Sequence, residues 1–153
     1  MKLAAGINFD ANGLAQSINA MQMSMDIMGI FGELIGNASE IDSVALNQEL
    51  KDIICEGEVI ECGFRVLRDK WVFTNKRLIM VDVQGITGKK KEYHSIPYRA
   101  ITHFSVETAG SFDLDCEMDI WITGIPEPYQ YELGRKVNVV AIQKALAYHI
   151  LFK

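Results

Sequence analysis

Hydrophobic residues follow two different periods along the chain, and the changes between them predict the order of the secondary-structure elements. Residues 42–54 carry apolar side chains at helical spacing, and Asp42 or Ser43 is suited to cap this helix. From residue 58 to residue 133 apolar and polar residues alternate, which is the pattern of strands. Helical spacing returns over residues 137–152. The two apolar stripes consist of Leu46, Leu50, Ile53 and Ile54 in the first helix and of Val139, Ile142, Leu146 and Ile150 in the last.

The alternating region divides into short runs that are separated by turn residues such as Gly, Asn and Pro. Its first run places Ile60, Cys62, Phe64 and Val66 on one buried face. Short connections join antiparallel neighbours, so the pattern predicts a mainly β fold, a small barrel or strongly bent sheet that the last helix covers. The expected strands are residues 58–67, 70–74, 78–83, 92–98, 101–108, 112–123 and 129–133.

Residues 27–35 also carry apolar side chains at helical spacing, and this short helix is too apolar to stand alone in water. It is expected to pack on the rest of the chain, on a partner or on a lipid surface. The sequence therefore divides into an N-terminal extension over residues 1–26, a helical segment over residues 27–56 and a barrel with its C-terminal helix over residues 57–153. The extension is expected to be flexible chain.

The composition is typical of one globular domain, with 153 residues of which 49% are hydrophobic and 23% charged. The net charge of −5 argues against a nucleic-acid-binding protein, but the charge is unevenly spread. Residues 1–60 carry a net charge of −7, residues 61–104 of +5 and residues 105–153 of −3. Segments of opposite charge attract each other either within one folded chain or between neighbouring subunits.

Neither the cysteines nor the N-terminal residues are typical of a secreted or membrane protein. Cys55, Cys62 and Cys116 are an odd number without C-x-x-C spacing, so no disulfide framework is expected. Cys62 and Cys116 fall at inward-facing positions and are predicted to be small core residues. The N-terminus lacks the apolar run of a signal peptide, and no stretch approaches the ~20 apolar residues of a membrane span. We expect a cytoplasmic protein.

Four acids at every second position form the most conspicuous polar pattern, in the run F-D-L-D-C-E-M-D-I-W-I-T over residues 112–123. A calcium loop that started at the first of these acids would need Gly at its sixth position and Glu at its twelfth, but Met118 and Gly124 stand there. An extended strand also cannot wrap its carboxylates around one ion. We therefore interpret this acidic ladder as a face exposed to solvent or to another subunit. Its members are Asp113, Asp115, Glu117 and Asp119.

Catalytic motifs are absent from the sequence. The loop G-I-T-G-K-K-K over residues 85–91 lacks the spacing of a phosphate-binding P-loop. His94, His103 and His149 are far apart, and none is spaced with a second metal ligand. Neither G-x-S-x-G, H-E-x-x-H nor G-x-G-x-x-G occurs. A Cys–His dyad stays open as a weak hypothesis, and no cofactor or metal is expected.

Several motifs follow one another in the order of a known family: T-N-K-R-L-I, S-I-P-Y, I-T-H-F-S-V-E-T-A-G and F-D-L-D, within residues 68–122. Over about residues 30–152 the chain resembles the bacterial pleckstrin-homology domain family. The resemblance implies a seven-stranded bent barrel capped by a C-terminal helix, and several family members resemble ring-shaped homo-oligomers. Residues 1–26 lie outside it and are either an extension or a mis-assigned start, since Met28 opens a segment that looks like the family's usual start.

The resemblance also suggests a place for anionic ligands. Eukaryotic pleckstrin-homology domains often bind phosphoinositides through basic residues around the first hairpin. The basic residues near that hairpin and in the following loop are Arg65, Arg68, Lys70, Lys89, Lys90 and Lys91. Asp69 interrupts the usual basic motif, so the expectation is a generic contact with an anion or an anionic lipid.

The sequence thus favours a non-enzymatic binding domain that assembles with copies of itself through protein–protein contacts. In this interpretation the acidic ladder lies at a subunit interface, where charge complementarity sets the register. The alternative is a peripheral module that binds anionic lipid or another anionic ligand through the basic residues and the apolar helix at residues 27–35. An enzyme built around His and Cys residues is the third hypothesis.

Overall fold

The first four strands form one antiparallel sheet in the order β1-β2-β3-β4. The computed structural model describes residues 40–85, 87–108 and 115–152, so the predicted extension at 1–26 and helix at 27–35 lie outside the described residues. Two-residue turns join β1 to β2 and β2 to β3, whereas the sequence placed the first turn one residue later and made the second connection three residues long. The strands are β1 (Ile60–Val66), β2 (Asp69–Thr74), β3 (Arg77–Gln84) and β4 (Lys90–Pro97).

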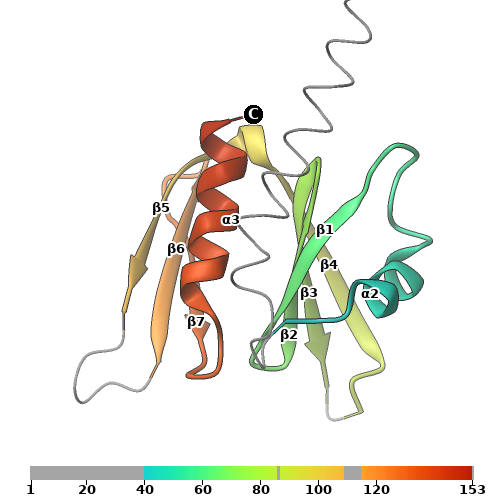
Figure 1. The fold of residues 1–153 in the computed structure, drawn as a ribbon. Helices are drawn as coiled ribbons and strands as arrows, with labels where there is room; N and C mark the ends of the chain where they lie inside the picture. Colours follow the sequence, from blue (N-terminus) through green and yellow to red (C-terminus); the bar gives the residue numbers. More distant parts are fainter. Residues whose placement is uncertain (1–39, 86, 109–114, 153) are drawn as a thin grey trace, which may run out of the picture. The chain divides into compact units, whose positions relative to one another are not determined.

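The remaining strands form a second antiparallel sheet in the order β5-β6-β7, which α3 follows (Figure 1). Strand β4 ends at Pro97, and a 3-10 turn, η1 (Tyr98–Ala100), carries the chain into this sheet. The elements are β5 (Ile101–Glu107), β6 (Cys116–Ile122), β7 (Tyr129–Leu133) and α3 (Val139–Leu151). The mainly β fold with seven strands and a C-terminal helix is therefore confirmed, with the strands divided between two sheets. No helix in the described part of the chain is long and apolar enough to cross a membrane.

Helix α3 covers the space between the sheets with a face of small and branched side chains. Asn138 caps its N-terminal end, where the side-chain Oδ1 accepts a hydrogen bond from the backbone N–H of Ala141 at 3.1 Å. Near its other end His149 is buried, stacked on Tyr98 with 4.0 Å between ring centroids, and its Nε2 lies 2.8 Å from Oε2 of Glu61. The buried face of α3 consists of Ala141, Ile142, Ala145, Leu146 and His149.

A second hydrophobic cluster lies on the opposite face of the first sheet, beneath α2 (Ser43–Leu50). Leu46 and Leu50 of α2 are buried there against apolar residues of β1, β2 and β3. Gly63 in β1 makes this close approach possible, because a Cβ at that position would overlap the Leu46 side chain. The first sheet is consequently buried on both faces. The residues of this cluster are Leu46, Leu50, Ile60, Val72, Ile79 and Val81.

The structure differs from the prediction in two places, the face to which Ile60 belongs and the residue at which the first helix ends. A register shift between Ile60 and Cys62 turns Ile60 toward the α2 cluster, so Ile60 does not share a face with Cys62, Phe64 and Val66. Helix α2 also ends at Leu50 instead of continuing to residue 54. In the turn that follows α2, the carbonyl of Ile53 accepts a hydrogen bond from Arg77 Nη2 at 2.9 Å, so this carbonyl is bound by a side chain from outside the helix. Asp42, one of the two predicted caps, accepts from Val44 N at 2.7 Å.

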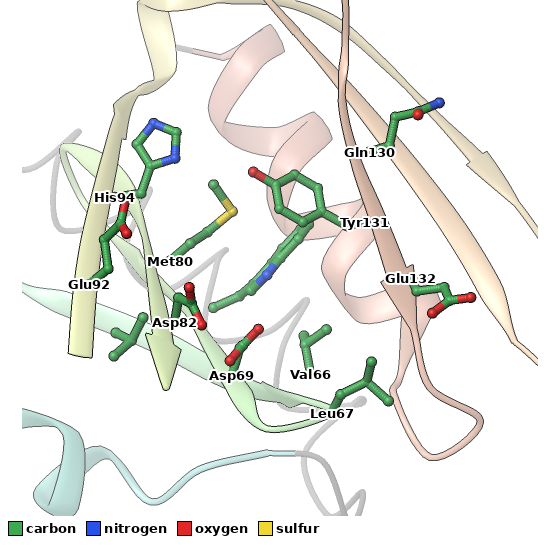
Figure 2. Close-up of a pocket in the computed structure, with 12 residues that line it drawn as sticks. Val66, Leu67, Asp69, Met80, Asp82, Glu92, His94, Gln130, Tyr131 and Glu132 are labelled. Atoms are coloured by element: carbon green, nitrogen blue, oxygen red, sulfur yellow. The ribbon is translucent and has the colours of Figure 1, made fainter. Parts of the chain in front are cut away.

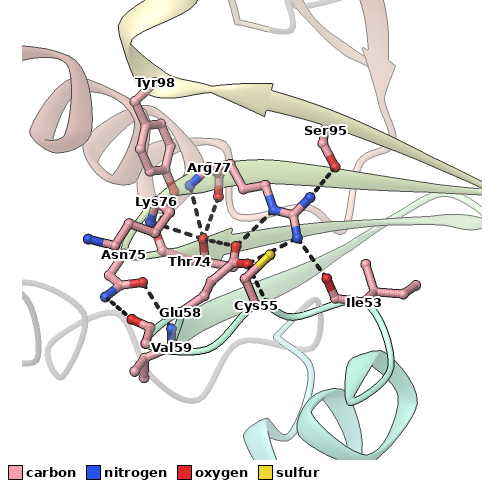
Figure 3. Close-up of polar contacts among 11 residues, drawn as sticks. Ile53, Cys55, Glu58, Val59, Thr74, Asn75, Lys76, Arg77, Ser95 and Tyr98 are labelled. Carbon is pink, nitrogen blue, oxygen red and sulfur yellow. Dashed lines mark hydrogen bonds and ion pairs between the residues drawn. The ribbon is translucent and has the colours of Figure 1, made fainter.

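One buried carboxylate, Glu58, joins the segment after α2 to the first sheet (Figure 3). Its oxygens accept hydrogen bonds from Arg77 Nε at 2.8 Å and Nη2 at 3.0 Å, and from the Thr74 hydroxyl at 2.8 Å. The backbone N–H of Cys55 donates to the same carboxylate at 3.0 Å. Arg77 further donates to Ser95 Oγ on β4 at 2.8 Å, so one polar network spans the α2 return, the β2–β3 hairpin and β4.

This network changes the acidity of Glu58. Burial raises the pKa of the carboxyl, but the hydrogen bonds from Arg77, Cys55 and Thr74 outweigh that effect and lower the pKa to about 2. Hydrogen bonding to Glu58 likewise raises the pKa of the Arg77 guanidinium above its usual value. Both groups therefore stay charged at neutral pH.

We predict that Leu46→Ala lowers the free energy of unfolding by about 3 kcal/mol, because it opens a cavity between α2 and the first sheet. Val44→Ala on the same helix is the matched control: Val44 is 72% exposed and Leu46 is 1% exposed. The control should change stability by less than about 0.5 kcal/mol. Urea unfolding followed by circular dichroism measures both, and equal effects of the two substitutions would contradict the packing described for α2.

We predict that Glu58→Gln removes part of the acid sensitivity of the fold. The pKa of Glu58 is lowered on folding to about 2, so its stabilisation is complete above its unfolded pKa of about 4.3 and is lost as the pH falls toward 2. At pH 7 the variant should be less stable by about 3 kcal/mol, since Arg77 then lacks its buried partner. Chemical unfolding from neutral to acid pH tests this, with exposed Glu56→Gln as control; identical pH profiles for the parent and Glu58→Gln would contradict it.

Candidate functional site

Two of the four members of the predicted acidic ladder lie in a described strand. Asp113 lies outside the described residues, and Asp115 precedes β6 and faces a hollow lined by basic residues. Glu117 and Asp119 lie in β6, where the intervening Met118 and the following Ile120 are fully buried as predicted. The described residues contain no group of three or more His, Cys, Asp or Glu side chains that could hold a metal ion.

Glu117 instead belongs to a row of glutamates that crosses the second sheet. It lies directly opposite Glu107 of β5 on one side and Glu132 of β7 on the other. All three side chains are exposed, and none forms an ion pair within the described part of the chain. Directly opposed like charges destabilise a sheet, so this glutamate row has a cost that the fold does not offset internally.

The six basic residues named from the sequence do not form one cluster. Lys70 and Lys91 both contact Glu49 of α2, with Nζ–Oε distances of 2.5 and 2.6 Å. Burial raises the pKa of Glu49, but hydrogen bonds and charge from these two lysines lower it overall. The Arg68 guanidinium donates to the carbonyl of Gly85 at 2.6 Å, which ties the β1–β2 turn to the β3–β4 loop. The exposed residues left are Arg65, Lys89 and Lys90.

Arg65 lines a hollow of about 330 Å³ together with two basic residues that the sequence reasoning did not select, Arg135 and Lys136. These two lie in the connection between β7 and α3, far from Arg65 in sequence. Asp115 contributes the one carboxylate of this basic hollow, and Leu67 and Val137 contribute apolar surface. Leu67 has a positive φ of 53° in the β1–β2 turn and is 57% exposed, an unusual backbone for a branched residue.

A larger hollow, of about 370 Å³, opens between the two sheets (Figure 2). We call it the inter-sheet pocket. Its interior is partly apolar, with Trp71 and Met80 of the first sheet facing Tyr131 of β7, and carboxylates surround this interior. Sequence reasoning missed it because its residues come from five strands and one turn. The pocket is lined by Val66, Leu67, Asp69, Trp71, Met80, Val81, Asp82, Glu92, His94, Gln130, Tyr131 and Glu132.

The three histidines lie in three different places in the fold. His94 lines the inter-sheet pocket, His103 stacks on Trp121 with 4.4 Å between ring centroids, and His149 is buried. All three cysteines are free, with Cys55 exposed, Cys62 buried as predicted, and Cys116 only half-buried. Burial raises the pKa of the Cys62 thiol, and the negative charge of the adjacent Glu61 raises it further. A reactive cysteine needs the opposite shift.

The two sheets closed by a C-terminal helix are the arrangement of a pleckstrin-homology-like domain. The family model for the bacterial PH domain matches residues 29–150, and the chain belongs to this family. Domains of this family are generally non-catalytic binding modules. The helix α2 that covers the first sheet lies within the matched residues.

Relatives and solved structures agree with this assignment. The chain is 51% identical over 121 residues to the uncharacterized protein YjqA of Bacillus subtilis, which covers 78% of this chain and 97% of that protein. A pleckstrin homology domain from Shewanella amazonensis SB2B is 51% identical, with a TM-score of 0.70 over 78% of this chain and 97% of its own. A DUF1696 family protein with a pleckstrin-homology domain from Shewanella loihica PV-4 is 52% identical, with a TM-score of 0.66 over 75% of this chain and 98% of its own.

Proposed function

We propose that this protein is a non-enzymatic scaffold that acts through protein–protein contacts and assembles with copies of itself into a ring. The observation that supports this proposal is the glutamate row of Glu107, Glu117 and Glu132, three directly opposed carboxylates without a cationic partner in the described chain. Neighbouring side chains in such a row are about 5 Å apart, so a basic surface docked against them would relieve their repulsion.

The same chain carries a complementary surface. Arg65, Arg135 and Lys136 of the basic hollow are exposed and form no ion pair within the described residues. Contact between the glutamate row of one copy and the basic hollow of the next joins two different surfaces. Contacts of this kind repeat from copy to copy and close into a ring when the rotation between subunits permits it. This proposed interface keeps Glu117 from the acidic ladder that the sequence suggested and adds Glu107 and Glu132.

A second candidate function is contact with anionic lipid, which the basic hollow itself favours. Three cations surround it, and the exposed Leu67 together with Val140, which is 51% exposed near the start of α3, adds apolar surface close by in sequence. Basic and apolar side chains in combination are what a peripheral contact with an anionic membrane surface uses.

We predict that Glu107→Gln/Glu117→Gln abolishes self-assembly, because it removes the charge that attracts the basic hollow of the next copy. Size-exclusion chromatography with light scattering should give a multiple of the monomer mass for the parent chain and the monomer mass for the variant. High salt should also weaken the parent assembly, since exposed charges are screened beyond about 8 Å at physiological ionic strength.

The matched control for this variant is Asp52→Asn/Glu56→Gln, which removes the same charge from exposed positions after α2. Thermal unfolding adds a second measurement: the glutamate variant should be at least as stable as the parent, because a like-charge repulsion is removed. A monomeric parent chain would overturn the proposal, and so would an assembly that both double variants retain.

For the lipid candidate we predict that the chain floats with vesicles that contain phosphatidylserine and stays behind with neutral vesicles, and that about 0.5 M salt releases it. Arg135→Gln/Lys136→Gln should lose this binding. Lys76→Gln/Lys144→Gln, which neutralises two exposed lysines elsewhere, should retain it. Equal flotation of the two variants would exclude the basic hollow as the lipid contact.

A further inference from the structure

The inter-sheet pocket continues the inner face of the first sheet beyond the apolar core. Trp71, Met80 and His94 lie side by side in β2, β3 and β4, since Trp71 pairs with Met80 and Met80 with His94. One step further along the same face the side chains become acidic. Asp82 lies directly opposite Glu92. The inner face of the sheet therefore ends in carboxylates that face the second sheet instead of solvent alone.

The opposite wall of the pocket comes from β7 and is aromatic as well as acidic. Tyr131 packs edge to face on Trp71 with 4.9 Å between ring centroids, and the ring centroids of Tyr129 and His94 are 5.1 Å apart. Burial raises the pKa of the Tyr131 phenol, so this hydroxyl stays protonated. Figure 2 shows Tyr131 directed toward Met80 across the pocket, whereas Glu132 extends from the other side of β7. Aromatic rings beside carboxylates are a favourable environment for an organic cation.

The carboxylates of the pocket lack cationic partners in the described part of the chain. Asp69 accepts a hydrogen bond from Val83 N at 3.0 Å, and Asp82 and Glu92 share the amide of Gln84, each at 3.1 Å. These partners are neutral. No described lysine or arginine forms an ion pair with any pocket carboxylate, and the cation that follows on the same face, Lys90, is exposed and unpaired. The carboxylates concerned are Asp69, Asp82, Glu92 and Glu132.

The shape of the inter-sheet pocket and its surroundings favours a polypeptide as ligand over a metal ion or a small solute. The carboxylates surround a hollow of about 370 Å³ and do not converge on one point, and no described cluster could hold a metal. A second hollow of about 320 Å³ shares Gln130, Tyr131 and Glu132 with the pocket and extends to Glu117 and Asp119 of β6. Both hollows follow β7, an edge strand whose only described ladder partner is β6. An extended peptide can pair with such an edge and present every second side chain to the same face.

We propose that the inter-sheet pocket binds an arginine side chain of a basic segment on a partner protein, with that segment lying extended along the free edge of β7. The planar guanidinium suits this pocket because it can stack on the half-buried ring of Tyr131, is more weakly hydrated than an ammonium group and donates to several carboxylates at once. Leu67 at the rim offers apolar contact to the aliphatic part of the same segment. This site lies on the inner face of the first sheet and shares one lining residue, Glu132, with the glutamate row proposed for self-assembly.

The test uses the full chain and a labelled peptide of alternating arginine and threonine, followed by fluorescence anisotropy. The dissociation constant should rise at least about tenfold in Asp82→Asn/Glu92→Gln, which neutralises the pocket without changing its shape. It should stay unchanged in Asp52→Asn/Glu56→Gln. A peptide with glutamate in place of arginine should not bind, a lysine version should bind more weakly, and saturating calcium should not displace the arginine peptide.

Tryptophan fluorescence localises the binding. The chain has 2 tryptophans, so Trp121→Phe leaves Trp71 in the pocket as the reporter, and its emission should change when the arginine peptide binds. Circular dichroism confirms that the Asp82/Glu92 variant is folded, which is expected because an opposed pair of charges is removed. Unchanged Trp71 emission, or a Kd that is equal in the pocket variant and the parent chain, would overturn the proposal.

The self-assembly experiment distinguishes this proposal from the proposed scaffold function. The Asp82/Glu92 variant should keep the assembly state of the parent chain while it loses the peptide. The Glu107/Glu117 variant should keep the change in Trp71 emission on peptide binding while it loses assembly, because neither residue lines the inter-sheet pocket. If the Asp82/Glu92 variant lost assembly but bound the peptide normally, the pocket would be a contact between copies and the inference about a partner segment would be wrong.

Discussion

Glu58 and Arg77 connect the turn after α2 to the β2–β3 hairpin, which no sheet ladder does. Arg77 begins β3, and its guanidinium also reaches Ser95 on β4 and the carbonyl of Ile53 in the turn after α2. Glu58 accepts hydrogen bonds from Nε and Nη2 of this guanidinium and from the hydroxyl of Thr74. A charge buried without its partner is strongly destabilising, so the network persists only as a whole. It fixes where α2 ends and therefore how α2 covers the outer face of the first sheet, which leaves the inner face to determine the pocket.

That inner face changes character along three neighbouring strands. At one end it is apolar and is closed by the stack of Tyr98 and His149. At the other end it is acidic and opens into the inter-sheet pocket. Because paired strands keep their rows in register, the change occurs at the same level in each strand. The inner-face series are Phe73, Trp71 and Asp69 in β2, Leu78, Met80 and Asp82 in β3, and Ile96, His94 and Glu92 in β4.

The sequence predicted the strands, both described helices and the fold class, because burial on alternate positions leaves a period of two that can be read directly. It did not predict the bulge that turns Ile60 to the other face, since a bulge adds one residue without a compositional signal. It also placed Lys90 and Lys91 in a loop, whereas β4 begins at Lys90. A strand that begins at Lys90 places Glu92 directly opposite Asp82 when β3 and β4 pair as a hairpin. The alternation of Leu78, Met80 and Asp82 was the available signal for an acidic end to the inner face.

Long-range pairing explains why the candidate surfaces were harder to predict than the fold. Glu107, Glu117 and Glu132 become neighbours only when β5, β6 and β7 are aligned, and Arg65 meets Arg135 only when the first turn lies near the end of β7. Both sets of like charges oppose folding by small amounts each, since exposed pairs contribute at most about 1 kcal/mol. The apolar core and the Glu58–Arg77 network do not require these charges. These charges lower the stability of the fold and the core does not need them, so binding of a partner explains them better than folding does. Opposed carboxylates beside aromatic rings attract cations.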